Sequence, residues 1–238
     1  LPGGVHFVSS LFEVVVIIMR CLVIAAGNVN SQWLRQIVRH DDTVICADRG
    51  ARYARAAGIT PAMIVGDFDS LTSTEKSQYA REGITLKEHP PAKDDTDTAL
   101  AFQEALALRP EEILIAGALG TRFDHSLANV HLLRTGFAHG VKTKIVDEYN
   151  EISLVAPPEP VIITGSPGDE FSLLPLTSEV KGVYVKGARW ELENACFSIG
   201  NPYGISNQLA AEKAHISITA GLMLLIRVFQ EKEDEINA

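Results

Sequence analysis

Short apolar runs alternate with helix-like segments through residues 20–146 of this 238-residue chain. The runs at residues 20–26, 43–47, 63–65 and 112–116 are mainly apolar, which is typical of strands buried on both faces of a sheet. The segments between them repeat apolar residues at helical spacing. The pattern predicts strands at residues 20–26, 43–47, 63–65, 84–87, 112–116 and 142–146, and helices at residues 32–40, 51–57, 74–82, 99–108 and 126–135. This alternation favours an α/β fold with a mainly parallel sheet covered by helices on both faces.

The pattern changes near residues 147–160, where Pro157, Pro158 and Pro160 interrupt regular structure. Helical periodicity is largely missing after this point, so a small antiparallel β-sandwich is predicted. Its short alternating runs are at residues 161–164, 170–174, 182–185, 196–199, 215–219 and 222–229. The chain is therefore divided into an N-terminal extension (1–18), an α/β domain (19–148), an all-β domain (149–230) and a charged tail (231–238).

Composition narrows the class of protein. With 46% hydrophobic residues the chain can form a real core, and its net charge of −9 argues against a nucleic-acid partner. Cys21, Cys46 and Cys196 form no CxxC motif and cannot all pair, which fits a reducing, cytoplasmic location. The apolar run at residues 14–18 is too short to cross a bilayer, so we expect no membrane association and give residues 1–18 no catalytic role.

Two carboxylates follow the predicted strand at residues 63–65. Asp67 and Asp69 flank Phe68, and strand alternation would put both carboxylates on the same side. Carboxylates held close together repel each other unless a cation joins them, and Mg²⁺ is the natural cation for such oxygen ligands. A turn capped by an Asp side chain is the alternative interpretation of this short pattern.

Other strand ends carry polar clusters as well. They are Asp48, the Asp94–Asp97 group before a helix, and the pair Arg122 and Asp124. Right-handed crossovers would bring these ends to one edge of the sheet, which predicts a metal–phosphate site there. The chain has no GxxxxGK[ST] motif and no GxGxxG motif, so we expect phosphate to be bound through the metal.

The ordered set of motifs resembles the thiamine pyrophosphokinase family. The matching pieces are Ala47-Asp48-Arg49-Gly50-Ala51, Gly66-Asp67-Phe68-Asp69-Ser70, Asp94-Asp95-Thr96-Asp97, Gly117 to His125, and Gly204-Ile205-Ser206-Asn207. The resemblance implies a Rossmann-like N-terminal domain that binds ATP and Mg²⁺ and a β-sandwich domain that binds thiamine. It also implies a homodimer with active sites at the subunit interface, and transfer of the pyrophosphoryl group of ATP to the thiamine hydroxyl, releasing AMP.

The nucleotide side of such a reaction needs charge neutralised on the phosphates. On this resemblance Asp67, Asp69 and Asp97 would hold Mg²⁺, and Arg122 would stabilise charge on the transferring group. Four further residues would contact ATP, each with a structural alternative: Asp48 and Thr96 as helix caps, Asp124 in an ion pair with Arg122, and His125 as a structural residue.

The resemblance also implies which residues bind thiamine. Ser206 and Asn207 offer donors and acceptors to an aminopyrimidine edge, and an ordinary turn is their alternative. Trp190 would lie against a ring, although burial in the sandwich core is the favoured alternative. Family members commonly carry an acidic residue where this chain has Gln208, and often Tyr where it has Trp190.

Two other functions fit part of the pattern. A nucleotide-sugar transferase could use Asp67 and Asp69 on a metal diphosphate, and a non-catalytic protein could sense thiamine or nucleotide. A nucleotide-sugar transferase would not need the loop at residues 117–125 or the Ser206-Asn207 turn. A sensor would not need polar clusters at so many strand ends.

Overall fold

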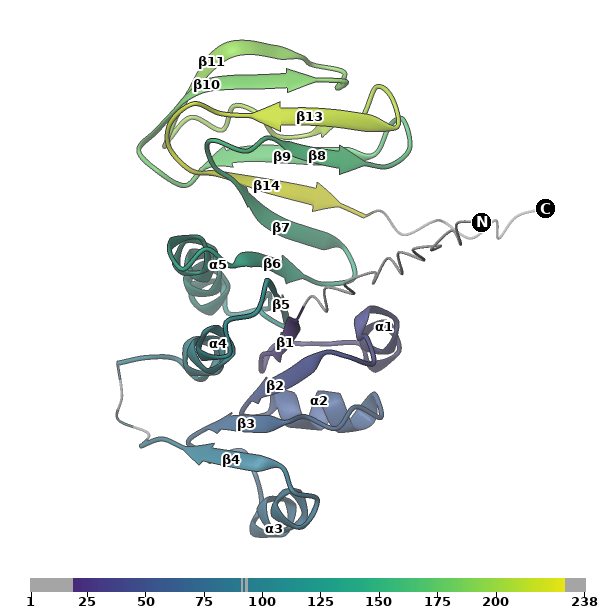
Figure 1. The fold of residues 1–238 in the computed structure, drawn as a ribbon, viewed down its shortest axis with the longest axis vertical. Coiled ribbons are helices and arrows are strands. Elements are labelled where there is room, and N and C mark those ends of the chain that lie inside the picture. Colours follow the sequence, from purple (N-terminus) through teal and green to yellow (C-terminus); the bar gives the residue numbers. More distant parts are fainter. Residues whose placement is uncertain (1–18, 91, 93, 230–238) are drawn as a thin grey trace, which may run out of the picture.

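The fold was analysed in a computed structural model that describes residues 19–90, 92 and 94–229 (Figure 1). The predicted extension at residues 1–18, Lys93 and the predicted tail at 231–238 lie outside the described residues. None of the helices in the described part of the chain is long and apolar enough to cross a membrane.

The N-terminal half forms a parallel sheet with helices on both faces. Its elements are β1 (Arg20–Ile24), α1 (Ser31–Ile37), β2 (Thr43–Ala47), α2 (Gly50–Ala56), β3 (Met63–Gly66), α3 (Ser73–Arg81), β4 (Thr85–Glu88), α4 (Asp97–Ala107), β5 (Glu112–Ala116), α5 (Phe123–Ala138) and β6 (Lys142–Val146). The strand order is β6-β5-β1-β2-β3-β4 and all these pairs are parallel. Alternation along β1 sends Leu22 and Ile24 into the core under α1, α2 and α3, and Cys21 and Val23 into the core under α4 and α5.

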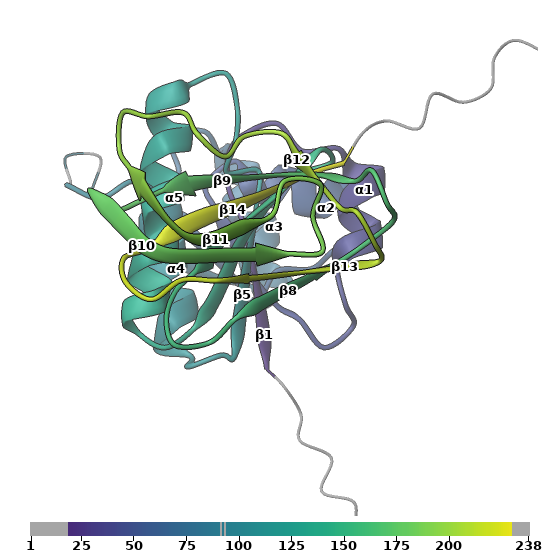
Figure 2. The same ribbon diagram turned by 90° about the horizontal axis from the view of Figure 1, so that it is seen from above.

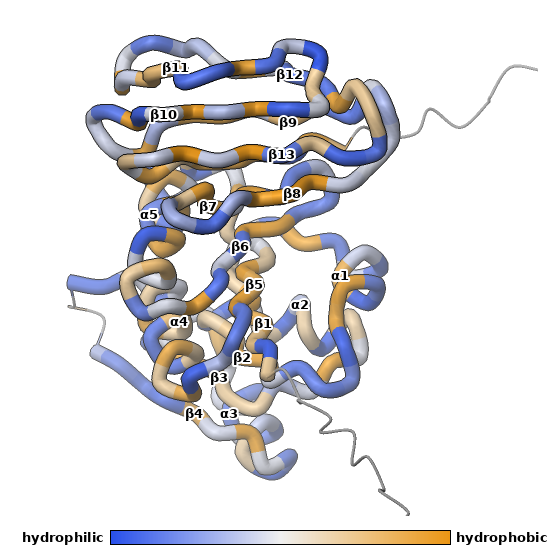
Figure 3. Tube along the Cα trace, turned by 45° about the horizontal axis from the view of Figure 1, so that its top comes forward, coloured by the Kyte–Doolittle hydropathy of each residue, from blue (hydrophilic) through white to orange (hydrophobic). Residues whose placement is uncertain are grey.

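The C-terminal half is antiparallel. Its strands are β7 (Asn150–Val155), β8 (Val161–Thr164), β9 (Glu170–Pro175), β10 (Glu179–Lys186), β11 (Leu192–Ser198), β12 (Asn207–Gln208), β13 (Lys213–Ser217) and β14 (Met223–Val228). Strands β11, β10, β13 and β8 form a separate sheet, which Figure 2 shows lying over β9 and β14. Hydrophobic and hydrophilic segments alternate along these strands (Figure 3), and the inward side chains form a third core between the two sheets.

One sheet passes through both halves. Strand β7 pairs antiparallel with β6, so the ten-stranded order is β12-β9-β14-β7-β6-β5-β1-β2-β3-β4. The predicted boundary at 148/149 falls between these two paired strands and stays a prediction. The packing of a mixed, helix-covered sheet against an antiparallel one confirms the predicted fold class.

The structure departs from the predicted elements in several bounds and in two strands that were not predicted, β7 and β12. Strand β7 was not predicted, because its sequence lies in the stretch that we interpreted as a proline-rich break. Helix α5 was predicted at residues 126–135 but spans Phe123–Ala138. Gly136, just after the predicted helix, is inside α5. A side chain at this position would clash with Thr143 of β6, so the glycine serves the packing of the helix on the sheet and does not end the helix.

Candidate active site

The strand order reverses between β1 and β5. From β1 the chain continues to β2 on one side, and from β5 it continues to β6 on the other. A crevice at the carboxyl ends of the strands is expected at such a point. A pocket of about 250 Å³ is found there, lined by residues that follow β1, residues that follow β5 and the start of α5.

Two loops meet tightly at this pocket. The Gly27 N–H donates to the Gly117 carbonyl oxygen at 3.0 Å, which ties the loop after β1 to the loop after β5. Gly117 has φ +69°, and a Cβ there would lie 2.6 Å from Val29 Cγ2 and 2.9 Å from the Ala25 carbonyl oxygen. Only glycine fits this conformation and this space. Gly117 therefore allows the two loops to approach each other closely beside the pocket.

Three aspartates converge beside the ends of β2 and β3. Oxygens of Asp48, Asp67 and Asp69 lie within 4.8 Å of one another. Strand β3 ends at Gly66, so a turn brings Asp67 and Asp69 together, rather than the strand alternation that we expected. The Asp69 N–H donates to Asp67 Oδ1 at 3.1 Å, which is the Asp-capped turn of the alternative interpretation; the same carboxylates also belong to the cluster.

Asp48 is the buried member of the cluster, with 8% of its surface exposed. Its Oδ2 accepts a hydrogen bond from Ser70 Oγ at 2.6 Å. Its Oδ1 is buried and has no hydrogen-bond partner among the described residues. A buried carboxylate oxygen without a partner is costly, and two more carboxylates nearby add repulsion. A divalent cation would remove both penalties, so the donor set fits Mg²⁺.

Asp97 lies next to this cluster but is not among its three carboxylates. It is the first residue of α4, and its Oδ1 lies 3.4 Å from the point that a Cβ on Gly66 would occupy. The Asp48 Cβ lies 3.1 Å from the same point. Thr96 caps α4, because its Oγ1 accepts from the Ala99 N–H at 3.1 Å. The alternative role of Thr96 as a cap is therefore present, and its phosphate contact stays a prediction.

The Arg122 and Asp124 side chains pair at the start of α5. Arg122 Nε donates to Asp124 Oδ1 at 2.9 Å and Nη2 donates to Oδ2 at 2.6 Å. The guanidinium hydrogen bonds hold the pKa of the Asp124 carboxyl well below its usual range. Arg122 and His125 both line the pocket. Both partners of the ion pair are exposed, so a phosphate could replace Asp124 at small cost.

The sequence analysis gave no role to several residues of the pocket, and Arg49 and Asn129 are two of them. Arg49 lines it and its Nη2 donates to the Ala26 carbonyl oxygen at 2.8 Å. Asn129 also lines it, is buried, and donates to the Ala118 carbonyl oxygen at 2.8 Å. The position of Arg49 directly after Asp48, at a strand end, could have identified it. Nothing in the helical pattern around Asn129 distinguishes it.

The predicted thiamine residues lie at the β12 end of the ten-stranded sheet. Asn207 is 7% exposed, and its side chain is used within the chain: Oδ1 accepts from the N–H groups of Trp190 (3.1 Å) and Gln208 (2.9 Å), and Nδ2 donates to the Trp190 carbonyl (2.8 Å). Its amide therefore fastens the segment that carries Trp190. Ser206 is exposed, with φ +57°, and its N–H donates to Ser172 Oγ at 3.1 Å.

The favoured core position of Trp190 is wrong. The side chain lies on the turn between β10 and β11 and is 52% exposed. The Arg189 guanidinium lies 4.7 Å from the centre of its ring, and Arg189 also donates to Gln208 Oε1 at 3.0 Å. An exposed indole backed by a cation and a fastened backbone presents a flat surface on which a ring could stack.

Comparisons with known proteins agree along the chain. A family model described as "Thiamin pyrophosphokinase, catalytic domain" matches residues 34–145, and one described as "Thiamin pyrophosphokinase, vitamin B1 binding domain" matches residues 160–223. The thiamine pyrophosphokinase of Bacillus subtilis (strain 168) is 31% identical over 183 residues, which are 77% of this chain and 86% of that protein.

Solved structures show the same likeness. The crystal structure of the Bacillus subtilis thiamine pyrophosphokinase has a TM-score of 0.80 and 28% identity, covering 89% of this chain and 99% of that one. The crystal structure of the thiamin pyrophosphokinase from Geobacillus thermodenitrificans has a TM-score of 0.79 and 27% identity, covering 90% of this chain and 99% of that one. The chain therefore belongs to the thiamine pyrophosphokinase family.

Proposed function

We propose that this enzyme transfers the pyrophosphoryl group of ATP to the hydroxyl of thiamine, giving thiamine diphosphate and AMP, with Mg²⁺ held by an aspartate cluster. The observation that carries the proposal is the buried, unpartnered Oδ1 of Asp48 in a cluster with Asp67 and Asp69. Such a set of oxygens is suited to a divalent cation and would repel a triphosphate without one.

The metal ligands are proposed as Asp48, Asp67 and Asp69, and Asp97 lies beside the end of β3 that precedes Asp67. When bound, Mg²⁺ would neutralise charge on the phosphates and bridge them to the carboxylates. Asp69 is exposed and Asp48 is buried, so phosphates would reach the bound cation from the Asp69 side of the cluster.

The pocket where the strand order reverses, between the loops after β1 and β5, would receive the rest of the nucleotide. Its cations are Arg49 and Arg122, and His125 and Asn129 add polar groups. Arg122 can bind phosphate oxygens with two parallel N–H groups once it leaves Asp124. Arg49 lines the pocket and directly follows Asp48 in the chain, so it would add positive charge close to the bound phosphates.

Thiamine would bind beside Trp190 and Ser206, with Asn207 holding Trp190 in place instead of contacting the substrate itself. This segment and the aspartates are far apart in one chain. Strand β12 lies eight positions from β3 in the sheet, about 38 Å along it at a spacing of roughly 4.8 Å. Reacting groups must come within about 3.5 Å, so a second copy of the chain has to supply one half of each site. This supports the proposed homodimer.

The assay combines purified protein, ATP, MgCl₂ and thiamine, with AMP and thiamine diphosphate measured by chromatography. Equal amounts of the two products are expected, and none in the presence of excess EDTA. ADP with thiamine monophosphate would contradict the proposed transfer. Tight binding of thiamine or ATP without turnover would support the sensor interpretation instead.

Mixing two defective variants tests the shared site. Asp69→Asn damages the aspartate half and Trp190→Ala damages the stacking half, so each homodimer should be weakly active. If one subunit completes the other's site, random mixing should restore about a quarter of the sites, because half of the dimers are mixed and each has one intact site. Activity that stays at the mean of the two variants, after subunit exchange has been demonstrated with tagged chains, would contradict the shared site.

Asn207→Ala should affect both stability and thiamine binding. The variant loses three hydrogen bonds of a buried amide, which should lower the free energy of unfolding by about 1–3 kcal/mol. With Trp190 no longer fastened, the KM for thiamine should rise several-fold while the KM for ATP stays unchanged. Chemical denaturation and steady-state kinetics measure the two effects. An unchanged KM for thiamine would show that Asn207 has no role in thiamine binding.

A further inference from the structure

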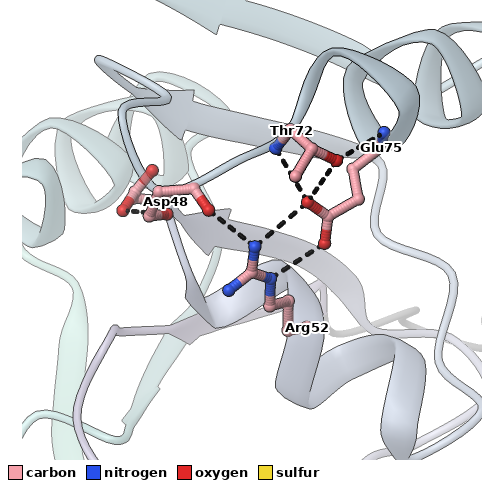
Figure 4. Close-up of polar contacts among 5 residues, drawn as sticks. Asp48, Arg52, Thr72 and Glu75 are labelled. Atoms are coloured by element: carbon pink, nitrogen blue, oxygen red, sulfur yellow. Dashed lines mark hydrogen bonds and ion pairs between the residues drawn. The ribbon is translucent and has the colours of Figure 1, made fainter.

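A chain of hydrogen bonds leads from α3 through α2 to the buried Asp48 (Figure 4). Arg52, on α2, donates from Nε to Glu75 Oε1 at 2.8 Å and from Nη2 to Glu75 Oε2 at 3.0 Å. The same Nη2 donates to the Ser70 carbonyl oxygen at 2.6 Å. One guanidinium therefore fixes both α3 and the end of the loop that carries Asp67 and Asp69.

Glu75 is itself held by the first turn of α3. Its Oε2 accepts from the Thr72 N–H and from Thr72 Oγ1, both at 2.8 Å, and its own N–H donates to Thr72 Oγ1 at 3.2 Å. This is a capping box. The hydrogen bond from Arg52, followed by those from Thr72, lowers the pKa of Glu75 to about 2, so Arg52 keeps an ionised partner at neutral pH.

Ser70 connects this hydrogen-bond network to Asp48. Its carbonyl oxygen is held by Arg52, and its Oγ donates to Asp48 Oδ2 at 2.6 Å. That bond occupies one oxygen of the carboxylate and leaves the buried Oδ1 without a partner among the described residues. Ser70 thus decides which oxygen of Asp48 is available and how the carboxylate is turned.

We infer that Ser70, held by Arg52, is a positioning residue that orients the Asp48 carboxylate toward the metal. This inference rests on the proposed function, because it needs the aspartates to bind a divalent cation. The structural alternative is that Arg52 and Glu75 only tie α2 to α3.

The chain contains a matched control for that alternative. Arg55, also on α2, donates to Glu82, the residue that follows α3, at 2.9 Å, and it lies over the Tyr79 ring. This pair joins the same two helices at their carboxyl ends. The aspartates instead follow the carboxyl ends of β2 and β3 and precede the amino ends of α2 and α3 in the chain. Arg55→Ala therefore removes a comparable tether and leaves Ser70 and Asp48 untouched.

The experiment measures Mn²⁺ binding to the full chain by electron paramagnetic resonance, without substrates. Ser70→Ala and Arg52→Ala should raise the Kd for Mn²⁺ by about 10- to 100-fold, the usual effect of losing a partner of a metal ligand. Arg55→Ala should leave the Kd unchanged. Tm values of the metal-free variants should show that all three are folded, with similar losses for Arg52→Ala and Arg55→Ala.

Kinetics add a second measurement. In Ser70→Ala the Mg²⁺ concentration needed for half-maximal activity should rise with the Mn²⁺ Kd, and saturating Mg²⁺ should restore most of kcat with an unchanged KM for thiamine. An Mn²⁺ Kd of Ser70→Ala equal to that of the unsubstituted chain would overturn the inference, as would an equal change in the Mn²⁺ Kd of Arg52→Ala and Arg55→Ala. Failure of the unsubstituted chain itself to bind Mn²⁺ would instead overturn the proposed metal site.

Discussion

The Asp69→Asn variant should fold normally and lose pyrophosphoryl transfer, with kcat/KM at least about 100-fold lower, the upper end of the loss seen when only a ligand's outer partner is removed. Asp69 is exposed and belongs to the three-carboxylate cluster. The asparagine amide has the same size as the aspartate carboxylate and can still form hydrogen bonds. It removes the negative charge that would bind the cation. Steady-state kinetics over a range of Mg²⁺ concentrations, with Tm as the test of folding, measure the effect.

A matched control is Asp41→Asn, which makes the same change in charge. Asp41 is exposed before β2 and lies 3.9 Å from His40, at the opposite end of that strand from Asp48. Its kcat/KM should equal that of the unsubstituted chain. If Asp69→Asn turns over as fast as Asp41→Asn, Asp69 does not hold a required metal.

Much of the fold could be predicted because local pattern and tertiary structure agree. The bounds of β2, β5 and β6 match the prediction. Strands β2 and β5 are mainly apolar runs, and β6, although it begins Lys-Thr-Lys, is set off by Gly140 before it and Asp147 after it. The unpredicted β7 shows where local reasoning fails: its strand state depends on pairing with β6 and β14, which no local signal records. The same pairing joins both halves of the chain into one sheet.

The sequence predicted an aspartate cluster with Asp67 and Asp69 in it, but named Asp97 rather than Asp48 as the third metal ligand. That aspartates meet at one edge follows from the alternation of strands and helices. Which of them meet depends on strand order: β2 and β3 are neighbours, so Asp48 joins Asp67 and Asp69, while Asp97 enters from the helix after β4. Trp190 was misjudged for a similar reason, because the exposure of a hairpin turn is decided by how the two sheets stack.

Phe68→Ala should cause a larger loss of stability than any variant described above. Phe68 is 2% exposed in the core under α1, α2 and α3, although its φ of +57° is strained for a side chain of this size. Such strain costs about 1–3 kcal/mol and persists only where the surroundings enforce it. Burial of the ring stabilises this strained conformation. Removing the ring should therefore lower the free energy of unfolding by about 3–5 kcal/mol. Urea denaturation measures it.

The substitution should also weaken the proposed metal site, since the buried ring holds the turn that brings Asp67 and Asp69 together. Under conditions where the variant is still folded, its affinity for Mn²⁺ should therefore fall. Phe197→Ala is the control, because Phe197 is also 2% exposed but lies in the sandwich core. It should lose a similar free energy of unfolding and keep its Mn²⁺ affinity. Equal Mn²⁺ affinities in the two folded variants would mean that the turn keeps its shape without the ring, and that its conformation is set by the backbone hydrogen bonds alone.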